Sequence, residues 1–168
     1  MAALSLLAVA GCSSGPIIPQ TLQVPAGQKL LLHAYGKGVQ IYTCASNSKA
    51  PSNFVWKLKG PEATLFDKCG NVIGSHYSGP TWENDRDASE VVGEMLQSKP
   101  SPVANAIPWL LIRTKSTQGT GLFHDVTYIQ RVNTKGGLPP LIVHNEAHLG
   151  EEVRVRYTAE YFFYRTER

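Results

Sequence analysis

The sequence predicts an all-β fold, a single-domain antiparallel sandwich or barrel with long loops. Short runs rich in β-branched and aromatic residues recur along the chain, Gly and Pro separate them, and none of them has a convincing helical period. The composition agrees, since 168 residues with 42% hydrophobic and 17% charged residues are typical of one globular domain.

The segment from residue 122 to residue 140 is the one in which all local rules agree. Residues 126–132 alternate as a strand does, and the Gly and Pro residues at 136–140 end it. One face would carry Val126, Tyr128, Gln130 and Val132, and the other Thr127, Ile129, Arg131 and Asn133. Both faces are half polar, so these polar side chains need partners or a cleft.

The other elements follow from the same signals. Residues 28–44 are predicted to form a hairpin that turns at Gly36-Lys37-Gly38. Short strands are expected at 54–58, 63–66, 72–77, 88–97 and 108–114, with turns at 60–61, 67–71 and 78–80, although 88–97 also suits a helix. A final long strand at 153–164 should bury Val153, Val155, Tyr157, Ala159, Tyr161 and Phe163.

The amino terminus carries a targeting pattern. Residues 2–10 are apolar, too few to span a bilayer, and end in Val9-Ala10-Gly11-Cys12, which resembles a bacterial lipoprotein cleavage box, although no Lys or Arg precedes the run. We therefore expect a signal at 1–12 with a lipid on Cys12, a tether at 13–23 and a β domain at 24–168. Export would allow a disulfide between Cys44 and Cys69, and two free thiols fit the sequence equally.

Several segments together resemble a bacterial and fungal family, domain of unknown function 3455. They are residues 24–27, 33–44, 60–67, 75–83, 107–111 and 126–137. The resemblance implies a secreted or surface β domain and no particular activity. The chain departs from the family at His144, where the family usually has a Cys that would pair with the one matched by Cys44.

Polar and aromatic residues around the 78–80 turn form the first candidate site. His76, Trp82 and Glu83 offer an imidazole, an indole and a carboxylate, which suit a sugar or another small polar ligand. The alternative is structural, with Trp82 in the core and Glu83 in solvent. The predicted ligand-binding residues are His33, Gln40, His76, Trp82, Glu83, Gln130, Arg131 and Asn133, with no catalytic or metal-binding residue among them.

Other chemistry has weaker signals. His33, His76 and His124 would suit zinc or copper if the fold brought them together. The pair His144 and His148 has the spacing of a helical metal site but too little room for a helix. Arg131 either clamps an anion or pairs with a carboxylate, for which we expect Glu83 or Glu62.

These observations predict a lipid-anchored β domain of the bacterial cell envelope that binds a small polar ligand or an envelope partner without catalysis or a cofactor. The net charge of +3 is small and scattered, which argues against a nucleic-acid partner. The membrane would be contacted through the lipid on Cys12. The alternative is a metal-dependent or acid/base enzyme using His33, His76 and Glu83.

Overall fold

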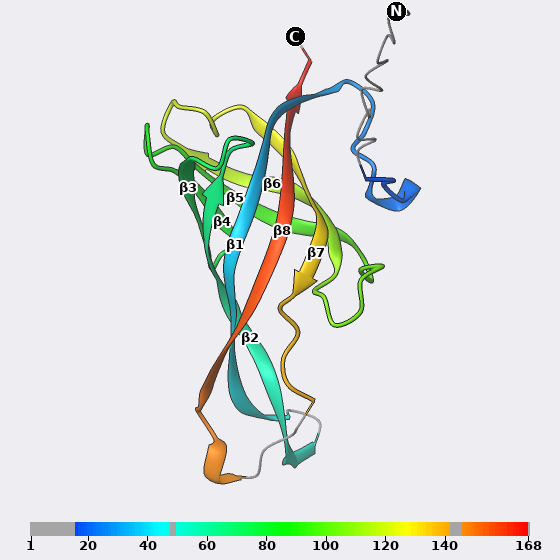
Figure 1. The fold of residues 1–168 in the computed structure, drawn as a ribbon, viewed down its shortest axis with the longest axis vertical. Coiled ribbons are helices and arrows are strands. Elements are labelled where there is room, and N and C mark those ends of the chain that lie inside the picture. Colours follow the sequence, from blue (N-terminus) through cyan, green and yellow to red (C-terminus); the bar gives the residue numbers. More distant parts are fainter. Residues whose placement is uncertain (1–15, 48–49, 142–145, 168) are drawn as a thin grey trace, which may run out of the picture.

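The computed structural model describes residues 16–47, 50–141 and 146–167. They form eight antiparallel strands, each hydrogen-bonded to the next, and the last pairs with the first to close a barrel (Figure 1). The strands are β1 (Gln28–Asn47), β2 (Ala50–Phe66), β3 (Val72–Tyr77), β4 (Thr81–Asn84), β5 (Glu90–Lys99), β6 (Trp109–Gln118), β7 (Val126–Gly136) and β8 (Glu152–Thr166). Two 3-10 turns, η1 (Gln20–Leu22) and η2 (Glu146–His148), complete the elements.

The all-β prediction is confirmed, and of its two architectures the structure forms the barrel. The barrel is irregular because β1, β2 and β8 are longer than the rest. They continue below the ring as a twisted ribbon (Figure 1). The segment at 88–97, which also suited a helix, is strand β5, and the long strand expected at the carboxyl end is β8.

The predicted hairpin at residues 28–44 is wrong, since β1 runs unbroken through Gly36 and Gly38. These glycines serve close packing between strands. A Cβ on Gly36 would lie 2.6 Å from the Tyr161 ring, and one on Gly38 would lie 2.1 Å from the Glu62 carbonyl oxygen. The Gly36-Lys37-Gly38 segment therefore marks a close approach between strands here and no turn.

The predicted turn at Gly60-Pro61 is also wrong. Ile41 of β1 pairs with Gly60 of β2 while the next residue, Tyr42, pairs with Leu58, so Lys59 is an extra residue in the ladder. This β-bulge lets one strand, β2, replace the two short strands that were expected. The pairing of β1 with β2 continues on both sides of the bulge, because a bulge absorbs strong strand twist without ending the ladder.

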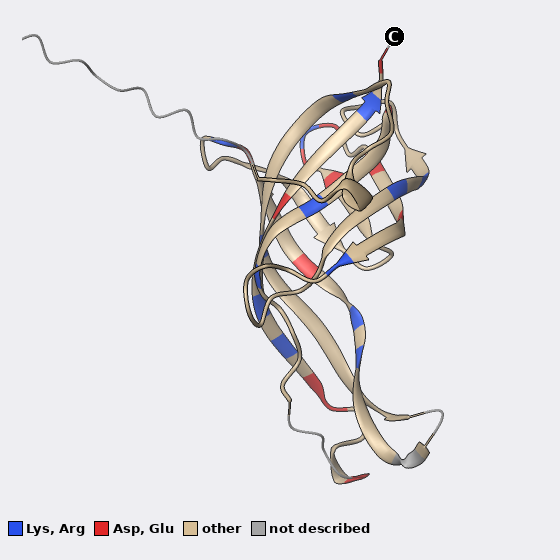
Figure 2. Ribbon diagram, turned by 90° about the vertical axis from the view of Figure 1, so that its right-hand side faces the viewer, with Lys and Arg blue, Asp and Glu red and all other residues tan. Residues whose placement is uncertain are grey.

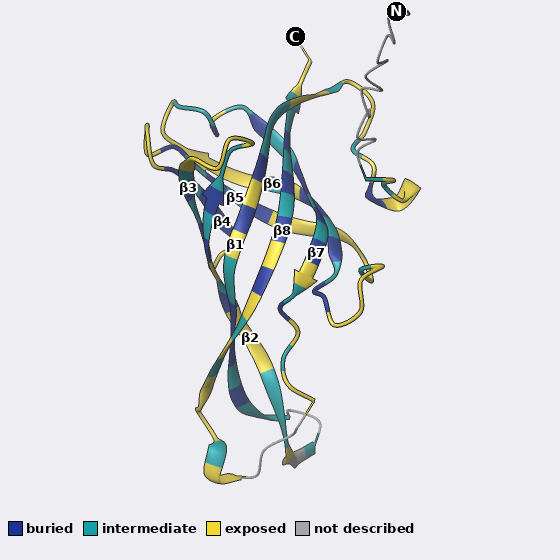
Figure 3. Ribbon diagram, viewed as in Figure 1, coloured by how far each residue is buried: buried dark blue, intermediate teal, exposed yellow. Residues whose placement is uncertain are grey.

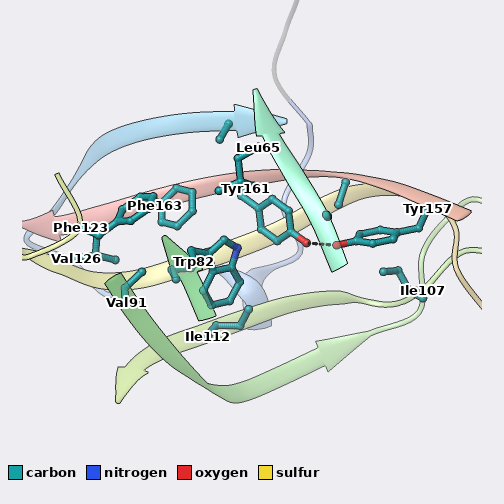
Figure 4. Close-up of a cluster of buried hydrophobic side chains, with 14 residues drawn as sticks. Leu65, Trp82, Val91, Ile107, Ile112, Phe123, Val126, Tyr157, Tyr161 and Phe163 are labelled. Carbon is teal, nitrogen blue, oxygen red and sulfur yellow. Dashed lines mark hydrogen bonds between the residues drawn. The ribbon is translucent and has the colours of Figure 1, made fainter. Parts of the chain in front are cut away.

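The barrel interior is apolar and aromatic. Trp82 is 1% exposed and Tyr161 and Phe163 are fully buried, and the Trp82 ring packs edge to face with each of the other two (Figure 4). Side chains from most strands join this core, while the ribbon below the ring is largely exposed or half-buried (Figure 3). For the same reason Val153 and Val155 of β8 are only half-buried, although their alternation predicted a core face.

A second apolar cluster lies on the outside of the barrel. Leu22 of η1 is fully buried there against Trp109, Leu111 and Val132. Gln130 fixes this contact, because its amide nitrogen donates to the Leu22 carbonyl oxygen at 2.6 Å. The last part of the predicted tether at 13–23 thus packs against the β domain.

Two of the predictions concern residues outside the described part. Cys12 and the rest of the signal lie there, and so does His144. Cys44 is buried and Cys69 is exposed, and both are free thiols. Across the described residues no helix is long and apolar enough to span a membrane.

Candidate functional site

His76 lies inside the barrel. Its ring stacks on Trp82 with centroids 4.3 Å apart and an interplanar angle of 7°. Its Nδ1 lies 2.7 Å from the Thr81 carbonyl oxygen, which can only accept, so Nδ1 carries the proton. Burial lowers the pKa of His76 to about 3, and the Arg131 charge adds to this effect. His76 is therefore neutral and sequestered, as expected of a structural histidine.

Arg131 also points inward, since its strand partners are Leu110 of β6 and Tyr161 of β8. Its Nε and one terminal nitrogen donate to the Pro108 carbonyl oxygen at 3.1 and 2.9 Å. The predicted carboxylate partner is wrong, because none of the ion pairs in the described part includes Arg131. A backbone carbonyl in the β5–β6 loop fills the role assigned to Glu83 or Glu62.

Gln40 completes the inward-facing set of predicted residues. It is 2% exposed on the same face of β1 as Ala34, and its amide nitrogen has no partner within the described residues. Near it, the Tyr42 hydroxyl donates to the Gly137 carbonyl oxygen at 2.7 Å. Gln40, His76, Trp82 and Arg131 thus belong to the interior.

Three side chains from three strands meet on the outer face. The Glu160 carboxylate of β8 lies 2.8 Å from the His33 Nε2 of β1 and accepts from the Asn133 amide of β7 at 3.0 Å. His33 also stacks on Phe162 with centroids 4.1 Å apart. Asn133 leaves the face predicted for it, because it has a φ of 49° in a bulge between Val132 and Lys135.

Glu83 is on the outer face at another place. The Tyr77 hydroxyl contacts it at 3.1 Å and contacts Glu90 at 3.2 Å. Burial and these two carboxylates raise the pKa of Tyr77 to about 12. Since Trp82 and Glu83 are consecutive residues of one strand, they point to opposite faces, and the site predicted around the 78–80 turn is split by the barrel wall.

The three-histidine metal hypothesis is wrong. The described residues contain no group of three or more His, Cys, Asp or Glu side chains that could hold a metal ion. His33 binds Glu160 outside, His76 is inside, and His124 contacts its neighbour Asp125 at 3.0 Å. The same separation leaves His76 unable to act with His33 and Glu83 in acid/base catalysis.

The outer face of β7, β8, β1 and β2 carries a groove. One part, of about 670 Å³, is bounded by the β2–β3 turn and the β5–β6 loop, and a second part of about 860 Å³ adjoins it along the ribbon. The residues common to both parts are Lys37, Phe66, Lys135 and Thr158. We call this surface the outer groove. Of the predicted residues, Asn133 lines it and His33 contacts its Tyr35 and Glu160.

Strand pairing sets two rows of side chains across this groove. In the first row Glu160 of β8 pairs with Tyr35 of β1, which pairs with Phe66 of β2. In the second row, Lys135, Thr158, Lys37 and Thr64 are successive partners on β7, β8, β1 and β2. Sequence analysis missed most of these residues, because their proximity depends on the pairing of β1 with β8. Alternation in 153–164 did place Glu160 on the polar face.

Residues 25–165 match a family described as a protein of unknown function, DUF3455. The chain belongs to this family. The resemblance found in the sequence is thus confirmed over most of the chain, and the family brings no activity with it. Searches of curated proteins and of solved structures found no match.

Proposed function

We propose that this protein is a lipid-anchored binding protein of the bacterial cell envelope, and that the outer groove holds a small polar ligand. Ligand binding is supported by the groove itself. It has a volume of about 670 Å³, and both aromatic and charged side chains line it. Binding sites for small molecules have this size and mixture.

The groove offers both kinds of contact that orient a ligand. Tyr35 is 38% exposed and lies beside Phe66, so together they present apolar area for a ring or an alkyl chain. Glu160 is held by His33 and Asn133, which fixes its position and leaves it neither mobile nor fully solvated. A pre-positioned polar group costs less entropy on binding than a free one.

The anchoring half rests on the Val9-Ala10-Gly11-Cys12 box. A lipid on Cys12 would hold the domain at the membrane, and the docked segment at 18–24 would set where the tether leaves the barrel. For a test, the chain and its Cys12→Ala variant are expressed in a bacterium and fractionated. We expect the parent in the membrane fraction and the variant in the soluble envelope fraction; a variant that stays in the membrane contradicts anchoring.

Ligand binding is tested separately with the soluble full chain carrying Cys12→Ala. Neutral sugars, amines and phosphate compounds are titrated while the intrinsic tryptophan fluorescence, to which Trp109 in the groove contributes, and the melting temperature are followed. We expect one class to bind, with at least a fivefold loss on Tyr35→Ala. If no class binds, or if Tyr35→Ala binds as the parent does, the outer groove is not a ligand site.

A further inference from the structure

Three cations line the second part of the outer groove, and no carboxylate is among the described residues that line this part. Lys37, Lys135 and Arg156 come from β1, β7 and β8, all are exposed, and all line the same part of the groove. None of the three takes part in the ion pairs formed within the described residues. Elsewhere on the strands blue positions for Lys and Arg recur down the molecule (Figure 2).

The strand register fixes how far apart the three charges are. Lys37 and Lys135 both pair with Thr158, on its two sides, so their backbones are two strand spacings apart, about 10 Å. Arg156 is two residues before Thr158 on the same face of β8, about 7 Å away. The long side chains of all three can therefore reach one ligand above Thr158.

The carboxylates that line the first part of the groove, and Glu62 on the adjoining β2, already have partners. Glu160 binds His33 and Asn133, and Glu62 forms an ion pair with Arg154 at 2.7 Å. Asp67, at the edge of the groove, accepts from the backbone N–H groups of Cys69 and Asn71 in its own turn. The cations thus repel one another in the free protein, and an anion would relieve this repulsion.

From this arrangement we infer that the ligand of the outer groove is a phosphorylated compound with more than one negative charge. This inference rests on the function proposed above and names its ligand class. Lys37, Lys135 and Arg156 would bind the phosphate oxygens, the Thr158 and Thr64 hydroxyls would donate to them, and Tyr35 with Phe66 would contact the less polar remainder. Spread over about 10 Å, the charges favour two phosphate groups over one.

The same chemistry is offered by two sources, a soluble polyphosphate compound and the phosphate headgroups of the membrane. Tripolyphosphate and vesicles represent them in the experiment. Binding of tripolyphosphate to the soluble full chain with Cys12→Ala is measured by calorimetry at 50 mM and 200 mM salt. Vesicles of phosphatidylglycerol, with phosphatidylcholine as control, are then sedimented with the same protein.

Lys37→Ala and Lys135→Ala are each expected to weaken tripolyphosphate binding about tenfold, and the double variant about a hundredfold. The matched control is Lys115→Ala on β6, which removes the same charge from outside the groove. Equal melting temperatures of the variants, all at exposed positions, show that the fold is kept.

Each outcome decides a point. If tripolyphosphate affinity falls in the Lys37 and Lys135 variants and is unchanged in Lys115→Ala, the anion site is supported. If the same groove variants also lose binding to phosphatidylglycerol vesicles, the natural ligand is a lipid headgroup. If the groove variants bind these vesicles as the parent does, the natural ligand is a soluble phosphorylated compound. No tripolyphosphate binding, or equal loss on Lys115→Ala, overturns the inference. Neutral sugars that still bind through Tyr35 would then leave the proposed function standing.

Discussion

The two faces of the barrel wall use similar side chains in opposite ways. Inside, His76 stacks on Trp82 and is kept neutral, and Arg131 is bound to the Pro108 carbonyl oxygen. Outside, His33 holds the Glu160 carboxylate at the rim of an open groove. The polar residues His76 and Arg131 on the inner face therefore serve the fold, whereas those that line the outer groove are accessible to a ligand. Because consecutive residues of a strand point to opposite faces, a shift of one position along the strand moves a side chain from one face to the other.

The largest difference between the two faces is expected when one aromatic side chain on each face is replaced by alanine. Trp82→Ala leaves a cavity in the core and should lower the free energy of unfolding by about 3–5 kcal/mol. Tyr35→Ala on the outer face should lower it by less than about 1.5 kcal/mol, because the ring is 38% exposed. Urea denaturation measures both, and equal losses would contradict the division between the faces.

A second prediction uses acid. The pKa of His76 is about 3 in the fold and about 6.5 in the unfolded chain, so between these values only the unfolded chain takes up the proton. The contribution of neutral His76 to the free energy of unfolding is therefore complete above pH 6.5, decreases by about 1.4 kcal/mol per pH unit below it, and levels near pH 3. His76→Gln, measured by urea denaturation at pH 6.5 and pH 4.5, should lose less than the parent. Identical losses in both proteins would show that His76 is not the cause.

A third and smaller effect concerns Arg131. Its replacement by Met removes two donors from a neutral carbonyl, which should cost about 1–3 kcal/mol. A buried ion pair, as the sequence suggested, would have cost about 3–5 kcal/mol. A double-mutant cycle with Glu83→Gln separates the cases: we expect additivity within about 0.5 kcal/mol, and a coupling above about 1 kcal/mol would restore the carboxylate partner.

The strands could be predicted wherever residues that are neighbours in sequence determine the local conformation. Alternation in 153–164 and the Gly-Pro stop after 126–132 depend only on neighbouring residues, and both strands are present. Gly36 and Gly38 misled, because a glycine that permits a turn also permits close strand contact, and only the Tyr161 and Glu62 neighbours distinguish the two.

The candidate site was less predictable for the same reason. His76, Trp82 and Glu83 are close in sequence, yet strand alternation sends Glu83 to the other side of the wall. Lys37, Lys135 and Thr158 are far apart in sequence, and only the closure of β8 on β1 and β7 brings them together. Sequence distance is a poor guide to a site on a closed sheet.

We expect ligands to bind on the outer face of the barrel and to leave its interior undisturbed. An amide NMR titration of the soluble full chain with tripolyphosphate tests this expectation most directly, since every backbone N–H reports its own surroundings. We predict shifts in residues 35–39, 134–137 and 156–160, with those of His76 and Trp82 unchanged. Shifts centred on His76 and Trp82, with none among the residues of the outer groove, would show instead that the ligand binds in the interior.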